Sequence, residues 1–255
     1  MNDIKFIMDS WISNINLDRD LISIFVHKPY NFRRNSVSSE KIKEQINKIE
    51  HEIGYKFGRI IRAKQTHSHN VRIINEDNIN EDFENVDGLI TSLKEVALVT
   101  SVADCQGILL YDTKNKVIGN IHSGRRWTLS RISTNAINIM VEEFNSNPEN
   151  IKVYISPSIH KCCFEVWEEL KHSFEEEFSE IDMADLIKMG KFKDGEQKYF
   201  IDIVGINKIV LLNLWINDGN IIISDECSVC NSDKFHSYRK DKPNDGRNIL
   251  LILLK

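Results

Sequence analysis

Residues 88–123 read GLITSLKEVALVTSVADCQGILLYDTKNKVIGNIHS, and this stretch decides the fold. It contains short β-rich runs separated by turn-forming or charged residues. These runs are Leu89-Ile90-Thr91, Val96–Val102, Gly107–Tyr111 and Val117–His122. Short runs of apolar and β-branched residues bounded in this way are typical of strands in a sheet. The centre of the chain is therefore predicted to consist of strands that follow one another directly.

Helices and further strands are predicted on either side of this centre. The predicted helices cover residues 36–54, 128–144, 163–178 and about 203–217. The second has apolar residues at three- and four-residue spacing and ends at Asn145–Asn150, and the last ends at Asp218-Gly219. Strands are predicted over residues 57–63, 151–155, 221–224 and 249–254. This order mixes consecutive strands with single helices, so the expected class is α+β, with helices outside mixed sheets.

Composition limits the possible functions. The chain has 255 residues, 41% of them hydrophobic, and no hinge-like linker, so residues 1–255 are expected to form a single domain. Its net charge of -5 does not favour nucleic acid as a partner. No apolar run approaches the roughly 20 residues that span a bilayer, and the first residues do not resemble a signal peptide. Five cysteines, an odd number, predict free thiols and a cytoplasmic location.

Three short segments carry residues that can do chemistry. They are Lys64-Gln65-Thr66-His67, Ala103-Asp104-Cys105 and Ile121–Arg126, each at or just after the end of a predicted strand. Two imidazoles and one thiolate, from His67, Cys105 and His122, suit a borderline-soft ion such as zinc. Three protein ligands leave a fourth position for water, as in catalytic zinc sites. The structural alternative is that each histidine is a hydrogen-bonded residue and Cys105 a small buried hydrophobe.

Arginines follow the last of these segments. Arg125 and Arg126 stand at the start of the helix predicted over residues 128–144, where free N–H groups favour anions. Their position predicts binding of a phosphate or a carboxylate. The alternative is that both are solvated surface residues. Two more arginines, Arg239 and Arg247, flank a turn near the carboxyl end and either face the same anion or are exposed.

The remaining cysteines give a weaker signal. Cys227-Ser-Val-Cys230 is a single C-x-x-C pair without a second such pair. Structural zinc sites usually combine two pairs. We therefore interpret this segment as a loop with incidental thiols.

Taken in order, these motifs resemble the laccase-domain family, also called the multicopper polyphenol oxidoreductase family. The matching segments are Gln65-Thr66-His67, Asp87–Thr91, Ala103-Asp104-Cys105, His122-Ser123-Gly124, Ser156–Val166 and Ser237–Arg247. Members of this family include purine nucleoside phosphorylases and the peptidoglycan editing factor. The matches span about residues 60 to 250, and their order carries more weight than any one of them.

The resemblance implies a layered α/β/β/α sandwich with zinc held by His67, Cys105 and His122. It implies phosphorolysis of purine nucleosides and deamination of adenosine, with purine nucleoside and phosphate as the small-molecule partners. Cys105, Asp104 and His122 are then the catalytic residues, Asp104 acting as an acid or base or behind the metal ligands. Arg126, Arg239 and Arg247 are our candidates for binding phosphate.

Two departures from the family pattern bear more on the expected substrate than on the expected metal site. The family reads H-A-G-W-R-G after the last ligand, whereas this chain has Arg125-Arg126-Trp127 after Gly124. The amino-terminal F-S-T-R-x-G-G element is also not recognisable. No arginine can therefore be carried over from that part of the chain.

Three alternatives remain open. Copper and polyphenol oxidation are less favoured than zinc, because a multicopper cluster needs several His-x-His pairs and only His67-Ser68-His69 is present. A cysteine hydrolase, with Cys105 as nucleophile and His122 as base, or a metal-dependent amidase would act on an amide in a peptidoglycan precursor. The last alternative is a degenerate member that binds a ligand without catalysis.

Overall fold

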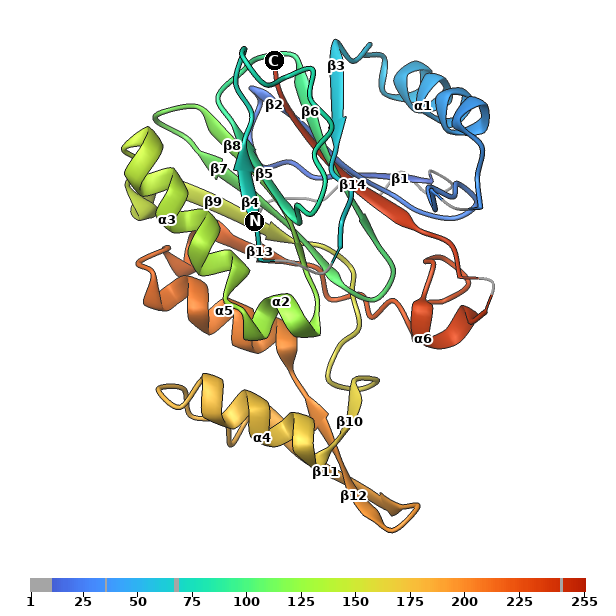
Figure 1. Cartoon of the computed structure of the whole chain (residues 1–255), viewed down its shortest axis with the longest axis vertical. Coiled ribbons are helices and arrows are strands. Elements are labelled where there is room, and N and C mark those ends of the chain that lie inside the picture. The colour runs from blue at the N-terminus through green and yellow to red at the C-terminus, as the bar shows by residue number, and fades with distance from the viewer. Residues whose placement is uncertain (1–10, 35, 67–68, 244) are drawn as a thin grey trace.

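Two mixed β-sheets lie face to face in this protein, with helices on their outer sides (Figure 1). The computed structural model describes residues 11–34, 36–66, 69–243 and 245–255. α1 (Ser39–Ile53) covers one sheet, and α3 (Ile132–Phe144) and α5 (Ile203–Asn213) cover the other (Figure 1). The layers therefore run α/β/β/α, which confirms the α+β sandwich with mixed sheets that the sequence predicted.

The five-stranded sheet is centred on the carboxyl-terminal strand. Its order is β1 (Ile12–Asn14), β2 (Leu21–Val26), β14 (Asn248–Leu254), β6 (Val96–Val102) and β3 (Arg59–Arg62). Every residue of β14 is buried. Alternate side chains serve opposite faces, as strand geometry requires: Leu250 and Ile252 contact the other sheet, whereas Leu251 and Leu253 join the cluster that includes Ile49 of α1.

The six-stranded sheet contains the strands predicted at the centre of the sequence. Its order is β13 (Ile221–Ile223), β9 (Ile151–Ile155), β7 (Gln106–Asp112), β8 (Val117–Ser123), β5 (Gly88–Thr91) and β4 (Val71–Ile73). β7 and β8 form an antiparallel hairpin in which every residue is buried. Between the sheets, the buried Asn120 amide donates to the carbonyls of Leu98 and Leu250 and accepts from Thr100, so a polar group links the two layers without an unsatisfied atom.

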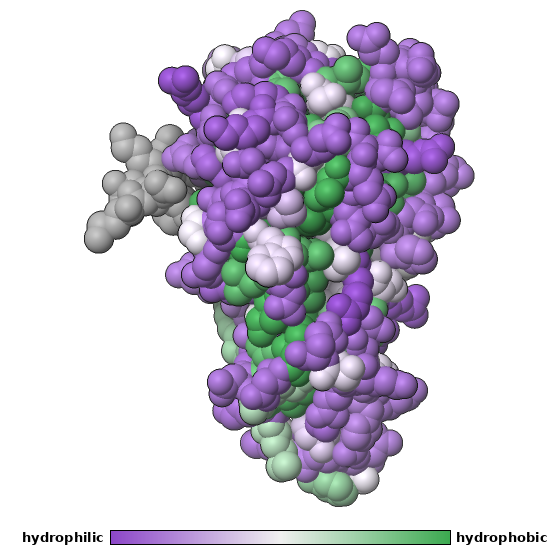
Figure 2. Space-filling model, turned by 90° about the vertical axis from the view of Figure 1, so that its left-hand side faces the viewer, coloured by the Kyte–Doolittle hydropathy of each residue, from purple (hydrophilic) through white to green (hydrophobic). Residues whose placement is uncertain are grey.

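A smaller unit projects from one end of the sandwich (Figure 1). It comprises β10 (Glu165–Trp167), α4 (Glu168–Glu177), β11 (Ile187–Lys193) and β12 (Glu196–Ile201), in the sheet order β10-β12-β11. Phe174 and Phe178 are fully buried in a core that the unit shares with Ile203, Ile206 and Val210 of α5. On the face seen in Figure 2, a hydrophobic strip runs between hydrophilic residues. None of the described helices is long and apolar enough to cross a membrane.

The helix predicted over residues 128–144 is instead two helices. α2 (Arg125–Leu129) is followed by α3, and the backbone of Arg131 between them has a φ of 52°, which a continuing helix does not allow. The Arg131 guanidinium pairs at 2.6 Å with Glu177, the last residue of α4, and at 2.7 Å with Glu180 just beyond it. These contacts hold the chain in a bend that apolar spacing alone does not reveal.

Other predicted boundaries also shift. The helix expected over residues 163–178 starts as strand β10, whose Val166 packs into the core of the projecting unit, and only then becomes α4. α5 ends at Asn213, because Trp215 has a φ of 66°. Gly219 lies in a separate short 3-10 helix, Asp218–Asn220. Two short helical segments, Pro148–Asn150 and α6 (Tyr238–Asp241), complete the described helices.

Candidate functional site

The register of the β7–β8 hairpin brings Cys105 and His122 together. Gln106 pairs with Ser123 and Gly107 with His122, so Cys105, one residue before β7, lies beside Gly124. A Cβ at Gly124 would stand only 2.5 Å from the Cys105 sulfur and 2.7 Å from the Trp127 ring. Glycine is therefore required here by close approach, and it lets the thiol lie against the start of α2.

Asp87 fixes the orientation of the His122 ring. Its carboxylate lies 3.0 Å from His122 Nδ1, and both side chains are buried. Burial lowers the pKa of His122, but the neighbouring Cys105 and Asp87 outweigh it and raise that pKa to about 9. The His122 ring also lies against Trp127, with ring centroids 4.3 Å apart. With Nδ1 held by Asp87, Nε2 is the atom left to face Cys105.

Asp104 is held by two segments that are distant in sequence. Its Oδ1 accepts from the Ser228 hydroxyl at 2.7 Å, and its Oδ2 accepts from the Arg239 backbone N–H at 2.6 Å. Its backbone has a φ of 75°, an uncommon conformation for a residue with a side chain. Both carboxylate oxygens thus have partners, so Asp104 anchors the turn that presents Cys105.

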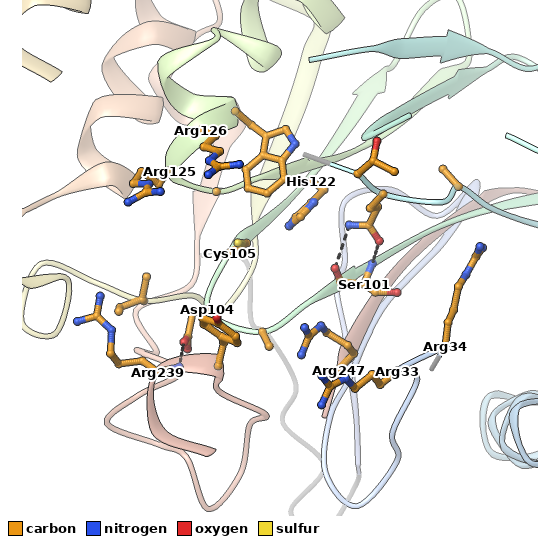
Figure 3. Close-up of a pocket in the computed structure, with 18 of the residues that line it drawn as sticks. Arg33, Arg34, Ser101, Asp104, Cys105, His122, Arg125, Arg126, Arg239 and Arg247 are labelled. Carbon is orange, nitrogen blue, oxygen red and sulfur yellow. Dashed lines mark hydrogen bonds between the residues drawn. The ribbon is translucent and has the colours of Figure 1, made fainter. Parts of the chain in front are cut away.

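These residues line a cavity of about 890 Å³ (Figure 3). Among its described lining residues the acidic one is Asp104, whereas nine are basic. The basic residues are Arg33, Arg34, Arg62, Lys64, Arg125, Arg126, Arg239, Lys242 and Arg247. In Figure 3 Arg125 and Arg126 lie on one side of Cys105, and Arg33 and Arg247 lie on the other. A concave surface lined this way attracts anions.

One buried carboxylate organises two of these arginines. Asp245 accepts from Arg33 Nη1 at 3.1 Å and also from Arg247 Nη1. Burial raises the pKa of the Asp245 carboxyl, but Arg247 and Arg33 outweigh it and keep that pKa below its ordinary value. One carboxylate facing two guanidinium groups leaves a net positive charge at this end of the cavity.

The three arginines predicted from the sequence all line this cavity. Arg239 Nη1 donates to the Cys163 carbonyl at 3.2 Å, and the Arg126 side chain is exposed. The prediction that a long helix would begin behind Arg125 and Arg126 is wrong, because α2 has only five residues. Their anion preference therefore rests on their own charge.

Sequence reasoning missed Arg33, Arg34 and Arg62. Arg33 and Arg34 follow β2, in the part of the chain where the family's amino-terminal motif is not recognisable. Two adjacent arginines were the one sequence feature there that could have indicated an anion site. Arg62 ends β3 and donates from Nε to the Ser101 hydroxyl at 3.0 Å. Nothing in its local sequence separates it from a surface residue on a strand.

His67, the remaining predicted ligand, lies outside the described residues. Gln65 and Thr66 just before it line the cavity. The Gln65 amide donates to the Ser101 carbonyl at 3.0 Å and accepts from the Ser101 N–H at 2.9 Å, which ties this segment to β6 (Figure 3). The structure thus brings together Cys105, His122, Asp104 and the three predicted arginines.

The donor set at Cys105 and His122 fits a metal ion. A thiol and an imidazole nitrogen face one another, and the second imidazole nitrogen is held by a carboxylate. This carboxylate–histidine arrangement is common behind metal-ligating histidines, because it fixes the tautomer and the ring orientation. Thiolate and imidazole together suit zinc or copper.

Proteins with similar sequences include several with named activities. An adenosine deaminase from an unknown prokaryotic organism is 28% identical over 80% of this chain and 78% of its own length. A purine nucleoside phosphorylase of Borreliella burgdorferi is 29% identical over 87% of each chain. One of Clostridium acetobutylicum is 29% identical over 92% of this chain and 93% of its own.

Solved structures share the fold. The hypothetical protein YfiH of Bacillus licheniformis superposes with a TM-score of 0.87 at 20% identity, covering 97% of this chain and 98% of its own. YlmD of Geobacillus stearothermophilus gives a TM-score of 0.85 at 18% identity, covering 99% of each chain. The family model described as multi-copper polyphenol oxidoreductase laccase matches residues 30–255. The chain therefore belongs to this laccase-domain family.

Proposed function

We propose that this protein is a zinc-dependent purine nucleoside phosphorylase that also deaminates adenosine. The observation that carries the proposal is the Cys105–His122 pair in the lining of a cavity whose described lining residues include nine basic ones. Relatives named as purine nucleoside phosphorylases and an adenosine deaminase support the same substrate class. The substrates would be a purine nucleoside with phosphate or water.

Phosphate binding would fall to the arginines. In phosphorolysis a phosphate oxygen bonds to C1′ of the ribose while the bond from C1′ to the purine nitrogen breaks. Arg126, Arg239 and Arg247 would hold the phosphate, with Arg33 beside Arg247, and so keep the nucleophile close to C1′. Guanidinium groups match phosphate oxygens in both charge and geometry.

Apolar and aromatic residues in the same cavity would bind the base. Trp127, Phe164 and Tyr238 all line it and offer flat surfaces for a purine ring. Trp127 also contacts the His122 ring, so a purine stacked there would lie next to Cys105 and His122. This arrangement would bring the base and the anion to neighbouring parts of one cavity.

Cys105, His122 and His67 would hold the zinc ion. When bound, zinc would supply a Lewis acid and lower the pKa of a coordinated water. Asp87 would keep Nδ1 of His122 protonated and Nε2 available, and Asp104 would position Cys105 through the turn that it anchors. In this assignment Asp104 acts behind the ligands, the second of the two roles expected for it.

Chromatography of reaction mixtures tests the proposal. Purified zinc-loaded protein is incubated with inosine or adenosine, with and without phosphate, beside Cys105→Ala. We expect free base from inosine only with phosphate, and inosine from adenosine without phosphate, neither being formed by the variant. Arg126→Ala should raise the phosphate concentration needed for half-maximal rate. No turnover by zinc-loaded wild type would overturn the proposal.

A cysteine hydrolase is the second candidate, favoured by the contact between the Cys105 thiol and the His122 imidazole. His122 would take the thiol proton and Cys105 would attack an amide carbonyl, for example in a peptidoglycan precursor. The C–N bond would break as His122 returns the proton to the leaving amine, and water would then release the acyl group from Cys105 as a carboxylate. Amide hydrolysis that survives chelation but is lost after thiol alkylation would favour this candidate over the zinc enzyme.

A further inference from the structure

Four cysteines that are distant in sequence converge outside the candidate active site. Cys162 and Cys163 lie between β9 and β10, and Cys227 and Cys230 lie after β13. Their sulfur atoms all lie within 4.8 Å of one another. The sulfur of Cys230 is 3.7 Å from that of Cys162 and 3.4 Å from that of Cys163, and those two are 3.7 Å apart.

These separations match the edges of a tetrahedron around a single ion. Sulfur atoms bound to one zinc ion at about 2.3 Å in regular tetrahedral geometry are about 3.8 Å apart. A disulfide would bring two sulfurs to about 2.0 Å, and the cysteines here are free. Ligands of a polynuclear iron–sulfur cluster bind different iron atoms and would stand farther apart. The geometry thus points to one ion with four thiolate ligands.

The surrounding backbone is arranged for a sulfur with negative charge. Backbone N–H groups of His160, Val229 and Cys230 donate to the Cys227 sulfur. Cys227 itself is buried and pairs with Ser158 in a short parallel bridge, with the Ser228 N–H donating to the Ser158 carbonyl at 2.8 Å. Backbone hydrogen bonds therefore already connect the two cysteine-bearing loops, and the four thiols lie where these loops meet.

We propose that Cys162, Cys163, Cys227 and Cys230 bind one zinc ion as a closed tetrathiolate site, separate from Cys105 and His122. All four positions are filled by protein ligands, which is the pattern of structural and not of catalytic zinc. Adjacent cysteines on one loop and a C-x-x-C turn on the other supply the ligands. Zinc suits the set because soft thiolates prefer it to magnesium or calcium.

This site clamps the two segments that support the candidate active site. Ser228, between the two cysteines of the turn, donates to Asp104, and the Arg239 side chain donates to the Cys163 carbonyl. The Arg239 backbone N–H donates to the same Asp104. An ion bound to both loops would thus hold Asp104 and Arg239 in register beside Cys105.

Metal analysis of four proteins tests the inference. Zinc per chain is measured in wild type, Cys105→Ala, Cys230→Ser and Cys230→His. Cys105→Ala should retain one zinc, because the tetrathiolate site does not use Cys105. Cys230→Ser should lose that zinc, whereas Cys230→His should keep it, since three cysteines and one histidine form a common zinc site. A Cys105→Ala protein that binds no zinc would overturn the proposal.

A second measurement does not depend on whether the Cys230 variants fold. X-ray absorption at the zinc edge of Cys105→Ala should show four sulfur neighbours at about 2.3 Å. Nitrogen or oxygen neighbours in that spectrum would overturn the proposal. The proposal would also be overturned if wild type purified without a chelator held no zinc and carried a disulfide between any two of the four cysteines. Mass spectrometry without reduction detects such a disulfide. A protein without nucleoside turnover would still give the same zinc content and the same X-ray absorption spectrum. Failure of the proposed activity can therefore be told apart from failure of the proposed tetrathiolate site.

Discussion

The protein carries thiols in two regions that are built in opposite ways. The sheet-edge site consists of Cys105, His122 and Asp87, placed by the register of neighbouring strands. The loop site consists of Cys162, Cys163, Cys227 and Cys230, placed by two irregular segments that meet through a single bridge. The first opens into a cavity, and the second has a thiol in each position that an ion would need. The geometry therefore distinguishes a site suited to catalysis from a site suited to a structural metal ion.

Cysteine replacements give the largest expected effect and can break this comparison. Cys105→Ala should reduce kcat/KM for nucleoside turnover by more than about 100-fold, because even partners behind metal ligands commonly contribute 10–100-fold. Its free energy of unfolding should stay close to that of wild type, because the β7–β8 pairing holds this part of the fold without the Cys105 side chain. Cys230→Ser should instead lower the free energy of unfolding by about 2 kcal/mol or more, since bound zinc adds to folding stability. Steady-state kinetics and urea unfolding of both variants measure the contrast, and equal stability losses would remove it.

Asp87→Asn sharpens the assignment of the sheet-edge site. An amide keeps the shape but loses the negative charge that orients His122. We expect metal affinity at this site, and with it activity, to fall by about 10–100-fold, while the loop site keeps its metal. Competition with a chromophoric chelator measures both sites in one titration. If both metals weaken together, the two regions are not independent.

Gly124→Ala tests the close approach at the sheet-edge site. The new Cβ would overlap the Cys105 sulfur and the Trp127 ring, so we expect a loss of about 1–3 kcal/mol in unfolding free energy, with reduced activity. Gly219→Ala is the matched control, because a Cβ there meets nothing within 4 Å. Urea unfolding should leave the control close to wild type. Equal destabilisation of both variants would contradict the packing argument.

The smallest expected effect is a pH dependence beside the loop site. His27 packs edge-on against Phe235, with ring centroids 5.4 Å apart, and Phe235 lies on the segment that follows the Cys227–Cys230 turn. Burial and the nearby Lys234 lower the pKa of His27 from 6.5 to about 4. The unfolded chain therefore takes up a proton near pH 6.5 that the folded chain resists until about pH 4. This stability is present above pH 6.5 and is lost as the pH falls toward 4.

His27→Phe removes the titrating group and keeps an aromatic ring on Phe235. Between pH 6.5 and 4 the wild type should lose about 1–2 kcal/mol more than the variant, after allowance for partial solvent screening. Urea unfolding across this range measures the difference. Hydrogen exchange at pH 5 should place the added opening in residues 227–241 and not in the β7–β8 hairpin. Parallel pH curves for the two proteins would exclude His27 as the cause.

The sheet-edge site was predictable from sequence because strands carry their own signal. Alternating and continuous apolar runs located β6, β7 and β8, and polar residues at their ends marked Asp104, Cys105 and His122. Helix boundaries were harder to predict. The bend at Arg131 depends on carboxylates near residue 180, and sequence spacing contains no record of such contacts.

The loop site was not predictable in the same way. Its two cysteine pairs are separated by more than 60 residues, with the whole projecting unit between them, and each pair alone resembles an ordinary loop. Arg33 and Arg62 were not predicted as cavity residues for a related reason. Only the folded sheets bring them to the cavity that Arg247 also lines. Local pattern predicts elements, whereas sites assembled from loops depend on the paths between them.

The projecting unit leaves the sandwich and returns to it at one point. The Ile201 N–H donates to the Phe164 carbonyl at 3.2 Å, so the outgoing and incoming strands are hydrogen-bonded where they meet, next to Cys163. Residues 165–200 thus form an excursion whose two ends are joined and whose core continues into α5 through Ile203, Ile206 and Val210. The tip of this excursion, the exposed turn at Asp194 and Gly195 between β11 and β12, can be lengthened or exchanged without repacking the sandwich, because it takes no part in that core. The same position would accept an inserted domain or a reporter in an engineered version of this protein.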